Sequence, residues 1–78
     1  MKISIYSTTT CPWCVLAKNY FKNKNIEFEN FNVGEDHEKA QEMIKISGQM
    51  GVPVIKIDDE ILVGFDQAKI EKILSNKN

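Results

Sequence analysis

Two cysteines separated by two residues constrain this chain more than any other feature. They are Cys11 and Cys14, with Pro12 and Trp13 between them, and the 78-residue sequence contains no other cysteine. A disulfide across so short a loop removes little entropy from the unfolded chain, so it would stabilise the fold only weakly. A secreted domain held by disulfides would need more cysteines, spread to close longer loops. The pair is therefore better suited to opening and closing than to holding a fold together.

The hydrophobic pattern predicts a single domain over residues 1–78 in which strands alternate with helices. Apolar residues alternate in the expected strands and recur every three or four residues in the expected helices. The predicted strands cover residues 2–6, 26–32, 54–57 and 61–63, and the predicted helices cover about 12–24, 35–47 and 67–76. The order βαβαββα contains a βαβ crossover followed by a hairpin. It predicts an α/β fold with a four-stranded mixed sheet and helices on its faces.

Residues at the ends of the predicted helices support these boundaries. Pro12 suits a first helical position, and Gly48 is a typical stop signal. Glu35 and Asp36 would form an acidic first turn, and Asp66 could cap the last helix. In the first predicted helix, two sets of apolar residues recur at helical spacing: Cys14, Ala17 and Phe21, and Leu16 and Tyr20.

Composition and charge exclude several classes of function. The chain is 42% hydrophobic and 27% charged, which is typical of a globular protein. A net charge of −1 gives no electrostatic basis for binding nucleic acid or an anionic membrane. No window approaches the roughly 18 apolar residues of a membrane span, and the N-terminus lacks a secretory apolar core. We therefore expect a cytoplasmic protein, and we expect it to be a monomer.

The spacing and placement of the cysteines fit thiol–disulfide exchange. This chemistry needs a thiolate, and the unpaired N–H groups of a helix start favour an anion. Cys11 would precede the first helix, and Cys14 would lie one turn later on the same side. At that separation the Cβ atoms are about 5–6 Å apart, close to bridging distance. We expect Cys11 to attack a disulfide and Cys14 to resolve the mixed disulfide.

A metal site is the main alternative use of two cysteines. A zinc site needs more ligands than this pair, and the only histidine, His37, lies in a different predicted element. We expect His37 to face solvent. The sequence therefore predicts no metal centre and no bound cofactor.

Three separated motifs resemble those of the glutaredoxins, within the thioredoxin superfamily. They are the segments 10–14, 47–53 and 63–66, with the sequences Thr-Cys-Pro-Trp-Cys, Ser-Gly-Gln-Met-Gly-Val-Pro and Val-Gly-Phe-Asp. The resemblance implies a minimal thioredoxin fold and dithiol oxidoreductase activity. It also implies a cis Val52–Pro53 bond beside Cys11, where the backbone of Val52 would pair with a bound peptide or glutathione. The substrate-binding residues that it implies are Pro12, Trp13, Gln49, Val52, Pro53, Gly64, Phe65 and Asp66.

Some residues depart from the glutaredoxin pattern. Thr8 and Met50 stand where glutaredoxins commonly carry basic residues that hold glutathione, and Gly51 stands in place of a threonine. Charge-assisted hydrogen bonds are the stronger kind, so glutathione should bind more weakly. Gly64-Phe65 resembles the small redoxins that serve ribonucleotide reductase and are recharged by thioredoxin reductase. An apolar rim around Cys11 would consist of Trp13, Met50, Val52 and Phe65.

The sequence leaves more than one function open. The first hypothesis is a dithiol reductase that takes electrons from glutathione and reduces protein disulfides or glutathione mixed disulfides. The second keeps the chemistry but takes electrons from a flavoprotein of the thioredoxin-reductase kind. A third, from another class, is an iron–sulfur cluster carrier that uses Cys11 of two chains and two glutathiones. A binding domain with inert cysteines is the fourth.

Overall fold

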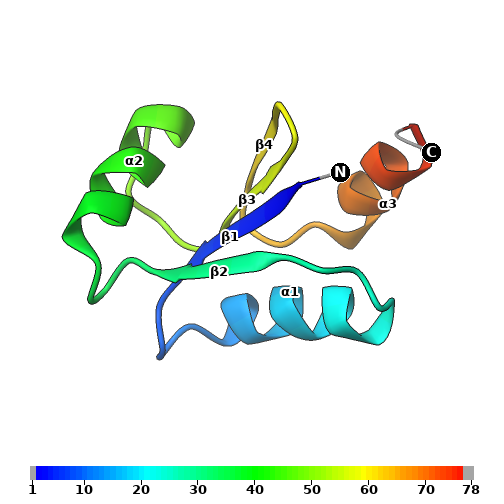
Figure 1. The fold of residues 1–78 in the computed structure, drawn as a ribbon, viewed down its shortest axis with the longest axis horizontal. Coiled ribbons are helices and arrows are strands. Elements are labelled where there is room, and N and C mark those ends of the chain that lie inside the picture. The colour runs from blue at the N-terminus through cyan, green and yellow to red at the C-terminus, as the bar shows by residue number, and fades with distance from the viewer. Residues whose placement is uncertain (1, 77–78) are drawn as a thin grey trace.

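Strands and helices alternate along the chain in the order that the sequence predicts (Figure 1). The computed structural model describes residues 2–76. The elements are β1 (Ile3–Ser7), α1 (Pro12–Asn23), β2 (Glu29–Asn32), α2 (His37–Ser47), β3 (Val54–Ile57), β4 (Glu60–Val63) and α3 (Gln67–Asn76). Within the described residues, no helix has the length and apolar character that crossing a membrane requires.

The four strands form one mixed sheet with the order β2-β1-β3-β4. β1 pairs with β2 in parallel, whereas β3 pairs antiparallel with both β1 and β4. The turn between β3 and β4 is formed by Asp58 and Asp59, as predicted. The α/β class, the mixed sheet and the order βαβαββα are confirmed, and the arrangement is the minimal thioredoxin fold that the resemblance implied.

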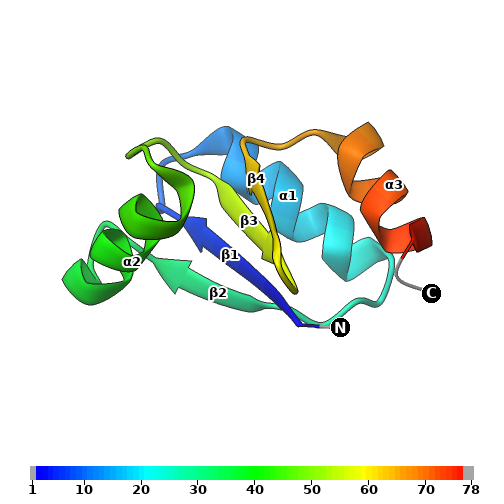
Figure 2. The same cartoon turned by 90° about the horizontal axis from the view of Figure 1, so that it is seen from above.

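The central strands give the sheet two different faces, because successive side chains of a strand point to opposite sides. α1 and α3 lie over one face and α2 lies over the other (Figure 2). The face under α1 and α3 buries the larger cluster, which consists of Ile3, Ile5, Ala17, Phe21, Ile55, Ile57 and Ile70. On the opposite face, Tyr6 and Val54 pack with Met43 of α2. The helix that follows the first cysteine therefore lies on the main core.

The phase of α1 decides which of its side chains reach this core. Cys14, Ala17 and Phe21 are spaced by three and four residues, and none has exposed surface. Leu16, which belongs to the second apolar set of the helix, has a side chain that is 47% exposed. At about 100° per residue, Leu16 is turned by about 100° or more from each of the three buried residues, so it points away from the sheet. Tyr20 is only partly buried, at the border of the cluster.

The predicted start of the second strand is also wrong. β2 begins at Glu29 rather than at residue 26. The Ile26 N–H donates to the carbonyl of Phe21 at 2.9 Å, and Asn25 turns the chain with φ 57°. Ile26 and Phe28 nevertheless pack against the core, so their apolar character reflects burial in a loop and not strand pairing.

The second helix begins at His37 rather than at residue 35. Asp36 is its N-cap, and the Asp36 carboxylate accepts a hydrogen bond from the Lys39 N–H at 3.1 Å. His37 is exposed, as expected. The predicted stop at Gly48 is confirmed, because Gly48 has φ 73° and its N–H donates to Ile44 O at 2.8 Å. The remaining elements begin and end within one residue of their predicted bounds.

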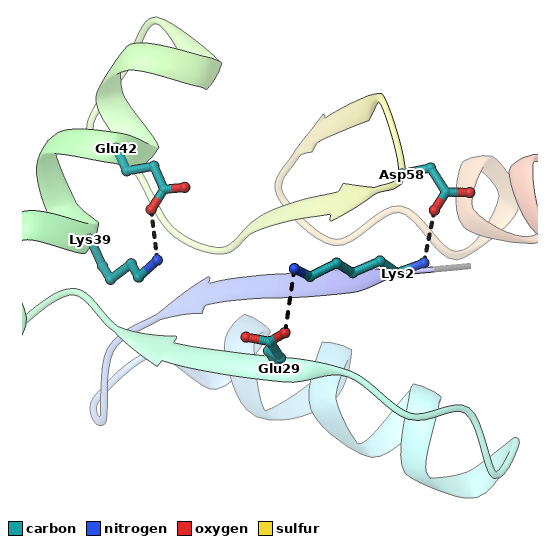
Figure 3. Close-up of polar contacts among 5 residues, drawn as sticks. All are labelled: Lys2, Glu29, Lys39, Glu42 and Asp58. Atoms are coloured by element: carbon teal, nitrogen blue, oxygen red, sulfur yellow. Dashed lines mark hydrogen bonds and ion pairs between the residues drawn. The ribbon is translucent and has the colours of Figure 1, made fainter.

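The α2 face of the sheet carries ion pairs (Figure 3). Lys39 Nζ lies 2.9 Å from Glu42 Oε2 and 4.2 Å from the centre of the Phe31 ring. Lys2 Nζ lies 3.7 Å from Glu29 Oε1. These side chains line a cavity of about 310 Å³ whose lining includes neither cysteine nor any residue between α2 and β3. This cavity is therefore separate from the cysteine pair.

We expect Phe21→Ala to lower the free energy of unfolding by about 3–5 kcal/mol, because removing a buried ring leaves a cavity. Leu16→Ala on the same helix is the matched control. It should change the free energy of unfolding by less than about 1 kcal/mol, because Leu16 is half exposed and alanine favours helix. Urea unfolding followed by circular dichroism measures both. Equal losses in the two variants would contradict the assignment of the faces of α1.

Candidate active site

Cys11 is the N-cap of α1, where the chain passes from β1 into the helix. Its backbone is extended, with φ −100° and ψ 110°, and Pro12 occupies the first turn as predicted. The Cys11 Sγ accepts a hydrogen bond from the Cys14 N–H at 3.2 Å. Cys11 is partly exposed. The Cys11 sulfur is therefore accessible from outside and faces a backbone N–H of the first helical turn.

Cys14 lies in the opposite environment, although it is only three residues away. Its side chain has no exposed surface. Burial and, to a smaller extent, the hydrogen bond with the Cys11 side chain raise the pKa of the Cys14 thiol to about 11. A backbone hydrogen bond from Thr8 and the charge of Lys18 act in the opposite direction but are outweighed. Cys14 is therefore held as a neutral thiol at neutral pH, behind the exposed sulfur of Cys11.

The loop before β3 forms the second side of the site. The Val52–Pro53 bond is cis, as the resemblance implied. The Val52 carbonyl oxygen lies 3.9 Å from Cys11 Sγ, so this bond is beside the first cysteine. The Pro53 carbonyl accepts a hydrogen bond from the Gly64 N–H at 2.7 Å. Segments that are far apart in the sequence, around residues 11, 52 and 64, are thus brought together.

Gln49 does not reach the cysteines in this structure. Its carboxamide bonds to Gly51, two residues further along the chain: Nε2 donates to the Gly51 carbonyl at 3.0 Å, and Oε1 accepts from the Gly51 N–H. Nε2 also lies 3.4 Å from Ser47 Oγ. The resemblance assigned Gln49 to substrate binding, whereas the structure places its polar atoms within the loop.

The predicted apolar rim divides into exposed and buried members. Trp13 is 59% exposed and Met50 is 77% exposed. Val52 is half-buried against the cluster on the α2 face, and Phe65 is half-buried against the main core. The Phe65 ring centre lies 5.8 Å from that of Tyr20. Trp13 and Met50 therefore offer the accessible apolar surface, whereas Phe65 mainly extends the core.

Two exposed residues near the site were missed by the sequence interpretation. Val15 is 46% exposed and Leu16 is 47% exposed, close to Trp13 on α1. The signal that could have found them is the spacing of Cys14, Ala17 and Phe21, which fixes the buried side of the helix. Once that side is fixed, positions 15 and 16 must face outward.

Gly64 and Asp66, which precede α3, both have local structural roles. Gly64 has φ 84°, a backbone conformation that favours glycine. Asp66 caps α3, since its carboxylate accepts a hydrogen bond from the Lys69 N–H at 3.2 Å. The predicted cap is confirmed, and this carboxylate is exposed at the start of the helix. Among residues 2–76, no group of three or more histidine, cysteine, aspartate or glutamate side chains is placed to hold a metal ion.

Comparisons with known proteins place the cysteine pair and the cis-proline within a known family model. The glutaredoxin family model matches residues 3–62, which include both cysteines and the cis-proline. An uncharacterised glutaredoxin-like 8.6 kDa protein in the rubredoxin operon of Clostridium pasteurianum is 53% identical over 72 residues, covering 92% of this chain and 96% of that protein. Glutaredoxin 3 of Escherichia coli strain K12 is 38% identical over 64 residues, covering 82% of this chain and 77% of that protein.

A solved structure with high similarity is that of NrdH-redoxin from Escherichia coli. It has a TM-score of 0.83 and 29% sequence identity, and the match covers 94% of this chain and 95% of that one. That protein is described as glutaredoxin-like with a thioredoxin-like activity profile. The family match spans most of the sequence, and the fold and the cysteine motif agree with it. The chain belongs to the glutaredoxin family.

Proposed function

We propose that this chain is a dithiol reductase of disulfides, with Cys11 as nucleophile and Cys14 as resolving thiol. The difference in environment between the two sulfurs carries the proposal. Cys11 Sγ is partly exposed and accepts the Cys14 N–H, whereas the Cys14 thiol is buried and has a pKa of about 11. The exposed sulfur is suited to begin the exchange, and the buried one to complete it.

The reaction has two exchange steps. The Cys11 thiolate attacks one sulfur of the substrate disulfide, which forms a mixed disulfide and releases the other sulfur as a thiolate. Cys14 then loses its proton and attacks the Cys11 sulfur, which forms the Cys11–Cys14 disulfide and releases the second substrate thiolate. The substrate gains two electrons and the protein loses two. A donor must return two electrons before the next cycle.

The identity of the donor is part of the proposal. Glutathione is one candidate, and a flavoprotein of the thioredoxin-reductase kind is the other. Thr8 and Met50 are uncharged where glutaredoxins commonly carry basic residues, and the Gln49 carboxamide is bonded to Gly51. The similar NrdH-redoxin has a thioredoxin-like activity profile. These observations favour the flavoprotein donor.

The partners that we propose are disulfide-bearing proteins in the cytoplasm. Trp13 and Met50 provide exposed apolar surface close to Cys11, which suits contact with another protein.

We expect NADPH and a bacterial thioredoxin reductase to sustain faster turnover than NADPH, glutathione and glutathione reductase. Hydroxyethyl disulfide is the common substrate, and NADPH consumption is followed by absorbance. The glutathione system should be slower by about tenfold or more, because two charge-assisted contacts are missing at positions 8 and 50. Fast turnover with glutathione would instead establish it as a working donor.

We expect Cys11→Ser to abolish all exchange, because it removes the attacking sulfur. With glutathione present to release the Cys11–glutathione mixed disulfide, Cys14→Ser should retain reduction of a glutathionylated substrate. It should lose reduction of protein disulfides, which needs both cysteines. Assays with a glutathionylated peptide and with insulin measure the two activities, and circular dichroism checks that both variants are folded. The opposite pattern would show that the roles of the two cysteines are reversed.

A further inference from the structure

The segment between α2 and β3 can be followed in Figure 2. It includes Val52, whose carbonyl oxygen lies 3.9 Å from Cys11 Sγ. Its start is tied to α2, since Ser47 Oγ lies 2.6 Å from Met43 O and 3.0 Å from Gln49 O. Its end is tied to the residue that follows β4, since the Gly64 N–H donates to the Pro53 carbonyl. Between these points, the Gln49 carboxamide provides the hydrogen bonds to Gly51.

A primary carboxamide is well suited to this position. It carries an acceptor oxygen and two N–H donors on one planar group, so it can satisfy the N–H and the C=O of one residue together. Gln49 does this with Gly51, as a neighbouring strand would. The backbone groups of Gly51 are therefore paired within the loop, next to the residue whose carbonyl faces Cys11.

The side chain of Gln49 and the absence of a side chain at Gly51 are matched to each other. A Cβ added to Gly51 would lie 2.7 Å from Gln49 Oε1, closer than real Cβ atoms approach an oxygen. No positive φ is recorded for Gly51, so the requirement for glycine there comes from the space that the carboxamide occupies. A threonine at this position, as the glutaredoxin pattern has it, would displace the Gln49 carboxamide.

We propose that Gln49 is a positioning residue for disulfide reduction. By bonding both backbone groups of Gly51, it fixes the loop so that the Val52 backbone stands beside Cys11 before substrate arrives. This role rests on the proposed reductase function. It differs from the direct glutathione contact that the resemblance implied, because the Gln49 polar atoms act on the loop and not on the substrate.

The test is the steady-state kinetics of Gln49→Ala with a peptide disulfide as substrate. Without the carboxamide the loop has to be ordered when substrate binds, so KM should rise about three- to tenfold, the range of one net hydrogen bond. The kcat should stay within about twofold, because Cys11 and its hydrogen bond to Cys14 are unchanged. Gln49→Glu keeps the oxygen that accepts from Gly51 but loses the donor, so its KM should lie between those of the other two proteins.

Gln41→Ala is the matched control, since Gln41 is an exposed glutamine on α2. It should leave KM and kcat unchanged. Gly51→Ala should raise KM by displacing the carboxamide, and the same change should have little further effect when Gln49 is already alanine. A KM in Gln49→Ala equal to that of Gln41→Ala, or a loss confined to kcat, would overturn the proposal.

Amide hydrogen exchange separates this proposal from the proposed function. The Gly51 N–H should exchange faster in Gln49→Ala than in the parent chain, and Gln41→Ala should not change its rate. If the parent chain reduced no disulfide, the proposed reductase function would be wrong, and so would the proposed kinetic role of Gln49. Accelerated exchange at Gly51 would still establish the hydrogen bonds within the loop, and unchanged exchange would overturn them.

Discussion

The packing of α1 against the isoleucine-lined face of β1 and β3 fixes the geometry of the site. Ala17 and Phe21 are fully buried in that interface, and Cys14 lies on the same side of the helix one turn earlier. Because a helix is a rigid element, the burial of Ala17 and Phe21 also buries Cys14. The same phase leaves Cys11 at the cap, ahead of the first turn and partly exposed. One packing interaction therefore sets both the stability of the fold and the positions of the two sulfurs.

The different chemistry of the two cysteines follows mainly from this geometry. Burial is the largest cause of the raised pKa of Cys14, and the charge of Lys18 is the smallest of those that act on it. Cys11 Sγ receives a backbone N–H from the first turn, which is a property of any helix start. An accessible sulfur at the helix cap and a neutral thiol in the core are thus produced by backbone and core, with little help from charged side chains.

The parts of the structure that the sequence predicted have local signals. The element order follows from hydrophobic periodicity, and the start of α1 follows from Pro12 beside the cysteine. The cis Val52–Pro53 bond came from the family resemblance, because no local pattern distinguishes a cis from a trans bond at that position. The loop from Ile26 to Phe28 was mistaken for strand, since a buried loop and a strand show the same apolar residues.

The role of Gln49 within the loop has no signal in the sequence. Its residue type allows it to bind a substrate, and the resemblance assigned it that role. The group to which the Gln49 carboxamide bonds depends on the conformation of the loop and on the space left by Gly51. Neither is visible in a periodicity or a motif. Leu16 is different, because the spacing of Cys14, Ala17 and Phe21 indicates which side of α1 is buried, and Leu16 lies on the other side.

The central claim is that the two cysteines differ because one is at the helix cap and the other is in the core. The most direct test is the alkylation of the reduced protein by iodoacetamide between pH 6 and pH 11, with each modified residue located by fragmentation in a mass spectrometer. With a pKa of about 11, only about one Cys14 thiol in a thousand is ionised at pH 8, and the thiol is also shielded from reagent. The account predicts that Cys11 is alkylated first throughout, and that modification of Cys14 begins only as the pH approaches 11. Equal rates at the two residues near neutral pH, or earlier modification of Cys14, would contradict it.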